Sequence, residues 1–264
     1  MKVILEPKVK VIAHSQFLGH PDYPIPTDGG DAVQLCAFAA KSCYDSFGAD
    51  GRPNAENQLG ILEHRHGSVM EHFYVSMFIE GVTRALTLEL NRHRLLNISQ
   101  RSTRYVKEED SAIVLEPYYA EFYRKFEIDK APITPENVNE YNVLFRFMGA
   151  AEYSFGSYND QVKYLMKQNP KKLDGFDLRK WARGKARNSL PHCLETRAVY
   201  TANLRAWRWI IEVRSGEGAE PEIRRLAHQL FMALSDVAPL HFDDFSMTRI
   251  IDGYPVYTPK FSKV

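Results

Sequence analysis

The chain has 264 residues, of which 44% are hydrophobic, and its formal net charge at pH 7 is +1. A chain of this length and hydrophobic content can bury a substantial core, so we expect a single domain over residues 1–264. The near-zero net charge excludes a polyanion-binding field over the whole surface and disfavours a nucleic-acid-binding module, so any anion site has to be local.

Sequence features of membrane, secreted and zinc-stabilised proteins are missing. Residues 1–6 are interrupted too soon by charge and proline to hold the apolar centre of a signal peptide, and no stretch approaches the roughly 20 apolar residues of a membrane helix. The three cysteines, Cys36, Cys43 and Cys193, are an odd number without paired spacing, which argues against a disulfide framework and a structural zinc site. We therefore expect a cytoplasmic protein with no membrane or nucleic-acid partner.

Hydrophobic patterning predicts an α+β fold with a mixed or antiparallel sheet and several long helices. In chain order, strands are predicted at Val9–Ala13, Phe73–Ile79 and Thr196–Ala202. Helices are predicted at Asp31–Tyr44, Asn54–His66, Val82–Arg94, Glu136–Lys167, Asp177–Ser189, Arg205–Val213 and Glu220–Ala238. Loops are predicted at Gly19–Gly30, Asn97–Thr103 and Glu127–Pro135. Asp252-Gly253 predicts a hairpin within Asp243–Pro259, to which we assign no chemistry.

A basic segment that begins at the end of the third predicted helix indicates an anion site. Arg92-His93-Arg94 is followed after seven residues by Ser102 and then by Arg104-Tyr105, and no acidic residue occurs between Leu90 and Val106. Guanidinium groups keep their charge and bind phosphate oxygens two at a time, so a phosphorylated small molecule fits. The alternative is a solvated basic surface, which is the usual role of a charge run.

This arrangement resembles the signature of the flavin-dependent thymidylate synthases, in which Arg-His-Arg is followed after seven residues by Ser. Further segments match the family in the same order and at similar spacings: Ser68-Val69-Met70-Glu71-His72, Arg104-Tyr105-Val106, Lys185-Ala186-Arg187 before Leu190-Pro191, Asn203-Leu204-Arg205-Ala206-Trp207-Arg208, Arg214, and Glu222-Ile223-Arg224-Arg225-Leu226-Ala227. The resemblance therefore covers most of the chain.

The resemblance implies a methyltransferase of nucleotide biosynthesis that makes dTMP from dUMP. It implies bound FAD, methylenetetrahydrofolate as one-carbon donor, NADPH as reductant, and a homotetramer with active sites shared between chains. The dUMP ligands it implies are Glu89, Arg92, Gln100, Arg101, Ser102, Thr103, Arg104, Arg187 and Arg214. The FAD ligands it implies are His66, Ser68, Glu71, Arg92, His93, Arg94, Gln100, Asn203, Arg205 and Trp209.

Arg214 is the expected catalytic residue. It would lie against the uracil carbonyl and N3, where its fixed charge stabilises an enolate-like anion and so raises the electron density at C5. The sequence departs from the family pattern at Trp209, where asparagine or histidine is usual, at Gly218, which replaces a frequent histidine, and at Cys43, where some relatives have serine. Trp209 would hold the flavin by stacking.

Three other groups of residues have metal-binding or nucleophilic side chains. His64, His66, Glu71 and His72 are of metal-ligand type, but their spacing matches neither a His-Glu-x-x-His helix nor a facial triad, so no metal site is expected.

Cys193 stands in a Pro-His-Cys sequence like the nucleophile of the unrelated thymidylate synthases, although a half-buried cysteine at the start of a strand explains it better. Ser102 is better explained as a hydrogen-bond donor to dUMP than as a nucleophile, for which His93 is the nearby base.

Two other classes of function remain. A non-catalytic nucleotide-binding regulator would keep the arginines without flavin contacts, and an RNA-binding module would use Tyr105 as a stacking platform. Neither explains why the C-terminal half also matches the family.

Overall fold

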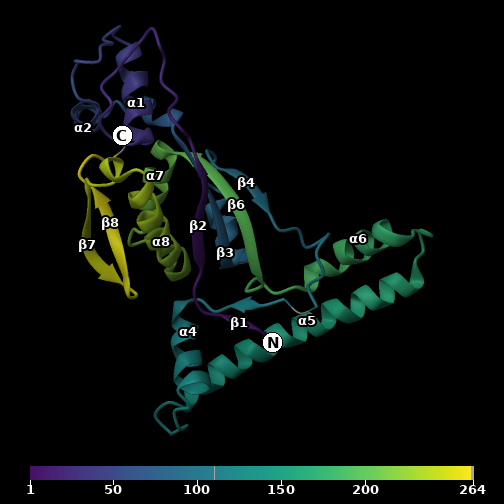
Figure 1. Ribbon diagram of the computed structural model, residues 1–264. Coiled ribbons are helices and arrows are strands. Elements are labelled where there is room, and N and C mark those ends of the chain that lie inside the picture. The colour runs from purple at the N-terminus through teal and green to yellow at the C-terminus, as the bar shows by residue number, and fades with distance from the viewer. Residues whose placement is uncertain (110, 263–264) are drawn as a thin grey trace. The chain divides into compact units, whose positions relative to one another are not determined.

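The structure is a computed structural model in which residues 1–109 and 111–262 are described. The fold is α+β, as predicted (Figure 1). The chain forms two compact units. Unit 1 contains Met1–Pro7, Glu80–Glu89 and Gln100–Ala198, and unit 2 contains Lys8–Ile79, Leu90–Ser99 and Val199–Val264. The chain crosses from one unit to the other after Pro7 and after Glu89, and also within three of the strands described below. The prediction of a single domain remains a prediction.

The strands form three sheets. One has the order β2-β3-β6-β4, with β2 at Lys8–His14, β3 at Tyr74–Thr83, β6 at Glu195–Asn203 and β4 at Asn97–Gln100. A second pairs β1 (Val3–Ile4) in parallel with β5 (Ile113–Val114). The third is an antiparallel hairpin of β7 (Phe245–Ile251) and β8 (Tyr254–Pro259), as Asp252-Gly253 predicted. Both turn residues have positive φ, +49° and +79°, which is the backbone geometry of a tight hairpin turn.

Unit 1 is mainly helical. Its helices are α3 (Arg84–Leu90), whose last residue belongs to unit 2, α4 (Pro117–Tyr123), the π-helical η2 (Arg124–Ile128), α5 (Val138–Gln168), α6 (Gly175–Ala186) and the short η3 (Arg187–Ser189). The helices α5 and α6 lie side by side (Figure 1) and bury Tyr158, Val162, Ala182 and Ala186 between them. A second core packs α4 and α5 on β5, with Leu115, Phe122, Phe126 and Leu144 among its residues.

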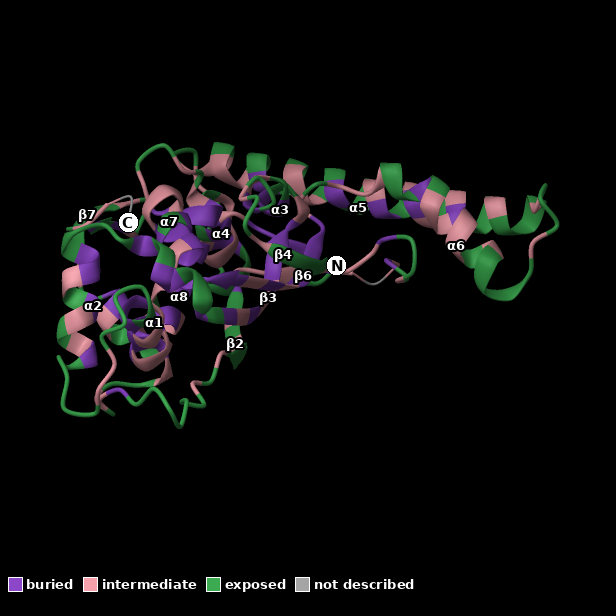
Figure 2. Ribbon diagram, turned by 90° about the horizontal axis from the view of Figure 1, so that it is seen from above, coloured by how far each residue is buried: buried purple, intermediate pink, exposed green. Residues whose placement is uncertain are grey.

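Unit 2 contains the remaining helices, which are α1 (Asp31–Ser42), α2 (Asn54–Glu63), η1 (Gly67–His72), α7 (Leu204–Arg214), α8 (Pro221–Val237) and η4 (Pro239–His241). The inner faces of α7 and α8 are buried (Figure 2). Trp207 is fully buried, and its indole N–H donates to the Val75 carbonyl at 3.2 Å. On α8, Ile223, Leu226 and Leu230 recur at helical spacing and form the buried face.

Local interactions correct three of the predicted boundaries. The helix predicted at Val82–Arg94 is only Arg84–Leu90, because β3 continues to Thr83 and the Thr83 hydroxyl accepts from the Leu86 N–H at 2.9 Å, capping the helix. The helix predicted to reach His66 ends at Glu63. The polar residues predicted as a loop from Asn97 include strand β4. In the described part of the chain, no helix has the length and apolar character needed to span a membrane.

Candidate active site

A hydrogen bond joins the end of α7 to the Arg-His-Arg motif. Arg214 is the last residue of α7, and its Nε–H donates to Nε2 of His93 at 2.8 Å. Burial, and secondly the charge of Arg214, lowers the pKa of His93 to about 4. The imidazole is therefore neutral at pH 7 and carries its proton on Nδ1, since Nε2 accepts this bond. His93 thus orients the guanidinium of Arg214.

The backbone around His93 is fixed by a turn and by β6. The His93 N–H donates to the Leu90 carbonyl at 3.1 Å, and the Leu96 N–H donates to the His93 carbonyl at 3.2 Å. The Tyr200 hydroxyl donates to the side-chain oxygen of Asn91 at 3.2 Å. Arg92 and Arg94, on either side of His93, are exposed. The motif therefore divides into one half-buried histidine that orients Arg214 and two guanidinium groups that reach solvent.

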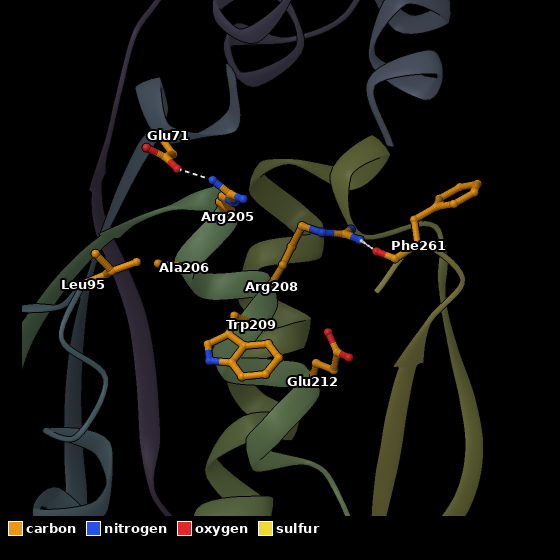
Figure 3. A pocket seen from close by; sticks show the side chains of 8 residues that line it. All are labelled: Glu71, Leu95, Arg205, Ala206, Arg208, Trp209, Glu212 and Phe261. Atoms are coloured by element: carbon orange, nitrogen blue, oxygen red, sulfur yellow. Dashed lines mark hydrogen bonds and ion pairs between the residues drawn. The ribbon is translucent and has the colours of Figure 1, made fainter. Parts of the chain in front are cut away.

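A cavity of about 320 Å³ lies along α7 (Figure 3). It is lined by Glu71, Leu95, Arg205, Ala206, Arg208, Trp209, Glu212 and Phe261. Arg205 and Glu71 face each other at one end, with Nη1 of Arg205 donating to Oε1 of Glu71 at 2.5 Å. The indole of Trp209 is 47% exposed and forms part of the wall. An apolar wall beside charged side chains suits a planar aromatic ligand with polar substituents.

Two predicted FAD ligands also have structural roles. Asn203 is buried, and its side-chain oxygen accepts from the Ala206 N–H at 2.8 Å, capping α7. Gln100 donates from its amide to the hydroxyls of Thr87 and Thr196, at 3.1 and 3.3 Å. His66 directly before η1 and Ser68 within it are exposed, and the same short helix carries Glu71. The hydrogen bonds of Asn203 and Gln100 hold these two side chains in fixed orientations.

Unit 1 contains a second, polar cavity of about 470 Å³. It brings together two predicted dUMP ligands, Thr103 and the exposed Arg187. Arg84 and His192 also line it, and neither was predicted from the sequence. Arg84 begins α3, ten residues before the end of the basic motif, and no recognised motif marks it. Two guanidinium groups and a threonine hydroxyl give this cavity the donors that a phosphate group requires.

Ser102 and Arg104 lie in a turn that is held by α6. The backbone N–H of Arg104 donates to the Ser102 hydroxyl at 3.3 Å, and the Arg104 side chain is exposed. Arg183 on α6 donates from Nη1 to the Tyr105 carbonyl at 2.7 Å. The ring of Tyr105 stacks on Phe176 with a centroid distance of 5.9 Å. The helix α6 thereby fixes the backbone that presents Arg104.

Arg101 differs from its neighbours because it pairs with carboxylates from outside the basic segment. Its guanidinium forms ion pairs with Glu108 at 2.8 Å and with Glu195 at 3.0 Å. The absence of acidic residues between Leu90 and Val106 therefore did not leave Arg101 without acidic partners. Its role as a dUMP ligand remains a prediction. Glu89, the one acidic residue among the predicted dUMP ligands, is half-buried on α3.

Comparisons with known proteins identify the family. Residues 27–240 match the family model of the thymidylate synthase complementing protein. The chain is 37% identical over 255 residues to the flavin-dependent thymidylate synthase of Mycobacterium tuberculosis (strain ATCC 25618 / H37Rv), covering 95% of this chain and 94% of the relative. The chain belongs to the flavin-dependent thymidylate synthase family.

Other relatives agree with this assignment. The flavin-dependent thymidylate synthase of Mycobacterium marinum (strain ATCC BAA-535 / M) is 36% identical over the same 95% of this chain and 94% of its own length. Among solved structures, the UMP/dUMP methylase PolB from Streptomyces cacaoi, bound with 5-Br dUMP, superposes with a TM-score of 0.65 over 91% of this chain and 95% of that chain. Its sequence identity is 18%, so this likeness shows the fold alone.

The structure also shows where two of the cysteines and the histidines His64 and His66 lie. Cys193 is half-buried just before β6, and Cys43 is exposed at the end of α1, where its thiol donates to the Ala39 carbonyl at 3.4 Å. Within the described ranges, no group of three or more histidine, cysteine, aspartate or glutamate side chains is placed to hold a metal ion. The rings of His64 and His66 are 6.0 Å apart, centroid to centroid.

Proposed function

We propose that this protein converts dUMP to dTMP with bound FAD, methylenetetrahydrofolate as one-carbon donor and NADPH as reductant. The observation that carries the proposal is the Arg214–His93 pair in a chain 37% identical to a flavin-dependent thymidylate synthase over 95% of its length. The methylation of dUMP and the flavin dependence follow from that family. The folate and NADPH roles rest on the resemblance.

Arg214 would activate the pyrimidine. C5 of uracil is not nucleophilic until C6 is attacked or N3 loses its proton, so the protein has to stabilise negative charge on the ring. A guanidinium held in place by neutral His93 at 2.8 Å provides a fixed positive charge for this purpose. Because the arginine is already oriented, little reorganisation is needed when the charge develops.

The arginines of unit 1 would bind the dUMP phosphate. Arg104 is exposed, and Arg187 lines a polar cavity with Thr103, where guanidinium forks and a hydroxyl match phosphate oxygens. Ser102 would donate to a uracil or phosphate oxygen, and Gln100 would contact dUMP through its side-chain carbonyl oxygen, because its amide nitrogen donates to Thr87 and Thr196. The remaining proposed dUMP ligands are Glu89, Arg92 and Arg101.

The cavity along α7 fits the flavin. Trp209 offers an exposed aromatic face, and Glu71 and Arg205 offer polar groups at one end. Arg92 and Arg94 supply exposed positive charge for a diphosphate. His66, Ser68, His93, Gln100 and Asn203 complete the proposed FAD ligands. When bound and reduced, FAD would supply the hydride that completes the methyl group.

We further propose that the protein acts in the cytoplasm as a homotetramer whose active sites are shared between chains. Cys36 and Cys43 are reduced thiols, in keeping with a reducing compartment. A shared site would let Arg104 of one chain and Arg214 of another contact the same dUMP.

The purified protein tests the proposal directly. We expect visible flavin absorbance that NADPH bleaches under anaerobic conditions, and release of tritium from [5-³H]dUMP to water when methylenetetrahydrofolate is added. A colourless protein that neither takes up added FAD nor releases tritium would contradict the proposal. Binding of dUMP without flavin would favour the alternative, a non-catalytic nucleotide-binding regulator.

A further inference from the structure

The β7–β8 hairpin has no function assigned by its sequence. It lies beyond residues 27–240, the part of the chain that matches the family model, and it holds none of the predicted site residues. The hairpin and Asp244 directly before it nevertheless bond to the middle of α7, the helix that ends in Arg214, and to Ser215 at its C-terminal end. These contacts lie within unit 2.

The first contact is at Ser215, the residue that follows Arg214. Ser215 is fully buried and closes α7. Its hydroxyl accepts from the Tyr257 N–H at 3.0 Å and donates to the Tyr257 carbonyl at 3.3 Å. The Tyr257 side chain is itself fixed, since its hydroxyl pairs with Nδ1 of His228 at 2.6 Å and its ring stacks on Phe231 at 4.0 Å. Strand β8 therefore holds the backbone next to Arg214.

The second contact is through Arg224, a buried arginine on α8. Its guanidinium donates to the backbone carbonyls of Gly216, Glu217 and Ala219, at 3.4, 3.2 and 2.7 Å. The same guanidinium forms an ion pair with Asp252 at the tip of the hairpin. The Arg224 side chain is 2% exposed, so Asp252 supplies the balancing charge for a cation out of contact with water.

The third contact anchors the base of the hairpin. Arg208, on the preceding part of α7, pairs with both oxygens of Asp244 at 2.6 and 2.9 Å and donates to the Phe261 carbonyl at 3.2 Å. Both side chains of this ion pair are buried. The hairpin is thus attached to α7 before Arg214, and to the turn directly after it.

We infer that the C-terminal β7–β8 hairpin is a positioning element for Arg214, acting through Ser215 and through the Arg224–Asp252 ion pair. This inference rests on the proposed function. His93 orients the guanidinium, while the hairpin fixes the backbone from which the side chain extends. A displacement of about 1 Å in a group that has to meet the reacting atoms can lower the rate on the order of 100-fold.

The substitution Asp252→Asn tests the inference. Asparagine also tolerates the positive φ of +49° at this position, so the change removes the charge and keeps the turn. We expect tritium release from [5-³H]dUMP to fall about tenfold. This loss is smaller than the loss on the order of 100-fold that full displacement of the arginine would cause. NADPH bleaching of the bound FAD, measured without folate, should stay within about twofold. Calorimetry should show weaker dUMP binding.

The matched control is Asp236→Asn, which changes an exposed aspartate on α8. It should leave both rates within about twofold of the wild-type rates. Equal tritium release and dUMP affinity in Asp252→Asn and Asp236→Asn would overturn the inference. A parallel loss of tritium release and FAD bleaching in Asp252→Asn would also overturn it, because a general loss of structure would then be the cause.

Two outcomes separate this inference from the proposed function. If the wild-type protein binds flavin but releases no tritium, the proposed function fails, whatever the variant does. If Asp252→Asn does not yield folded protein, Ser215→Ala removes the hydrogen bonds between Ser215 and strand β8 and is measured in the same way. Selective loss of tritium release in Ser215→Ala supports the inference, and wild-type release overturns it.

Discussion

Arg214 donates a hydrogen bond from Nε to Nε2 of His93 at 2.8 Å, joining the end of α7 to the centre of the Arg-His-Arg motif. The two residues are 121 positions apart in the sequence. The charge of Arg214 helps to keep the His93 imidazole neutral, and the neutral imidazole accepts the hydrogen bond from Arg214. The motif therefore includes a residue that orients Arg214 as well as two exposed arginines.

The first prediction concerns Arg214. We expect Arg214→Ala to lower tritium release from dUMP on the order of 100-fold or more, the usual effect of removing one preorganised charge contact. Arg214→Lys should recover little, because lysine keeps the charge but lacks the Nε–H that bonds to His93. The measurement is kcat for tritium release, with flavin content determined in each variant.

Cys193→Ala is the matched control for a cysteine nucleophile. It should keep wild-type turnover within about twofold, because no thiolate step is part of the proposed chemistry. Loss of all turnover in Cys193→Ala, with folding and flavin binding intact, would instead indicate a thiolate mechanism and contradict the role given to Arg214.

The second prediction concerns pH and His93. The native pKa of about 4 lies below the ordinary 6.5, so at pH between these values the unfolded chain binds a proton that the native protein does not. Stability is therefore complete above pH 6.5 and falls as the pH decreases toward 4, by up to about 1.4 kcal/mol per pH unit. We expect His93→Gln to reduce this slope, measured by urea unfolding at several pH values.

His241 limits how far the pH dependence of stability is expected to decrease in His93→Gln. Burial, and secondly the charge of Arg208, lowers the pKa of His241 to about 3, so it contributes a slope of the same sign over the same range. Burial also lowers the pKa of His228, so the slope in His93→Gln should decrease and not vanish. An unchanged slope would show that His93 titrates alike in the native and unfolded states.

Much of the fold followed from local sequence patterns. The helices α7 and α8 were predicted to within about a residue, because strong amphipathic periodicity coincided with signals of a helix start. These signals are the N-cap Asn203 for α7 and the first-turn proline Pro221 for α8. Strands β1 and β5 were missed because each has only two residues, too few to show alternation.

The site was predicted less completely than the fold. A contiguous motif identified Arg92, His93 and Arg94, but the sequence could not show that His93 bonds to Arg214. The pairing of Arg101 with Glu195 was equally hidden, since the two residues are 94 positions apart and meet only through the adjacent strands β4 and β6. Long-range pairs of this kind are a property of the folded sheet.

The third prediction separates stability from binding in the basic segment. Arg101→Ala removes the guanidinium from Glu108 and Glu195, two buried carboxylates, so we expect the free energy of unfolding to fall by about 3 kcal/mol. Arg104→Ala removes an exposed side chain and should change it by less than about 0.5 kcal/mol while weakening dUMP binding. Urea unfolding and dUMP calorimetry measure the two effects. Equal stabilities would contradict the structural role of Arg101.

The last prediction tests whether the active site is shared between chains. Homomers of Arg104→Ala and of Arg214→Ala should both be poorly active, because every site lacks one of the two arginines. In mixed oligomers made by co-expression, some sites would take Arg104 from one variant and Arg214 from the other, and these sites would have the wild-type residues.

Activity should therefore return in part, and the closed symmetry of most homo-oligomers makes such pairing geometrically reasonable. Two affinity tags, one on each variant, allow the mixed species to be isolated before tritium release is measured. The control is a mixture of Arg104→Ala chains carrying the two tags, which should stay inactive. If isolated mixed oligomers are no more active than the separate variants, each site takes Arg104 and Arg214 from one chain, and the proposal of a shared site is wrong.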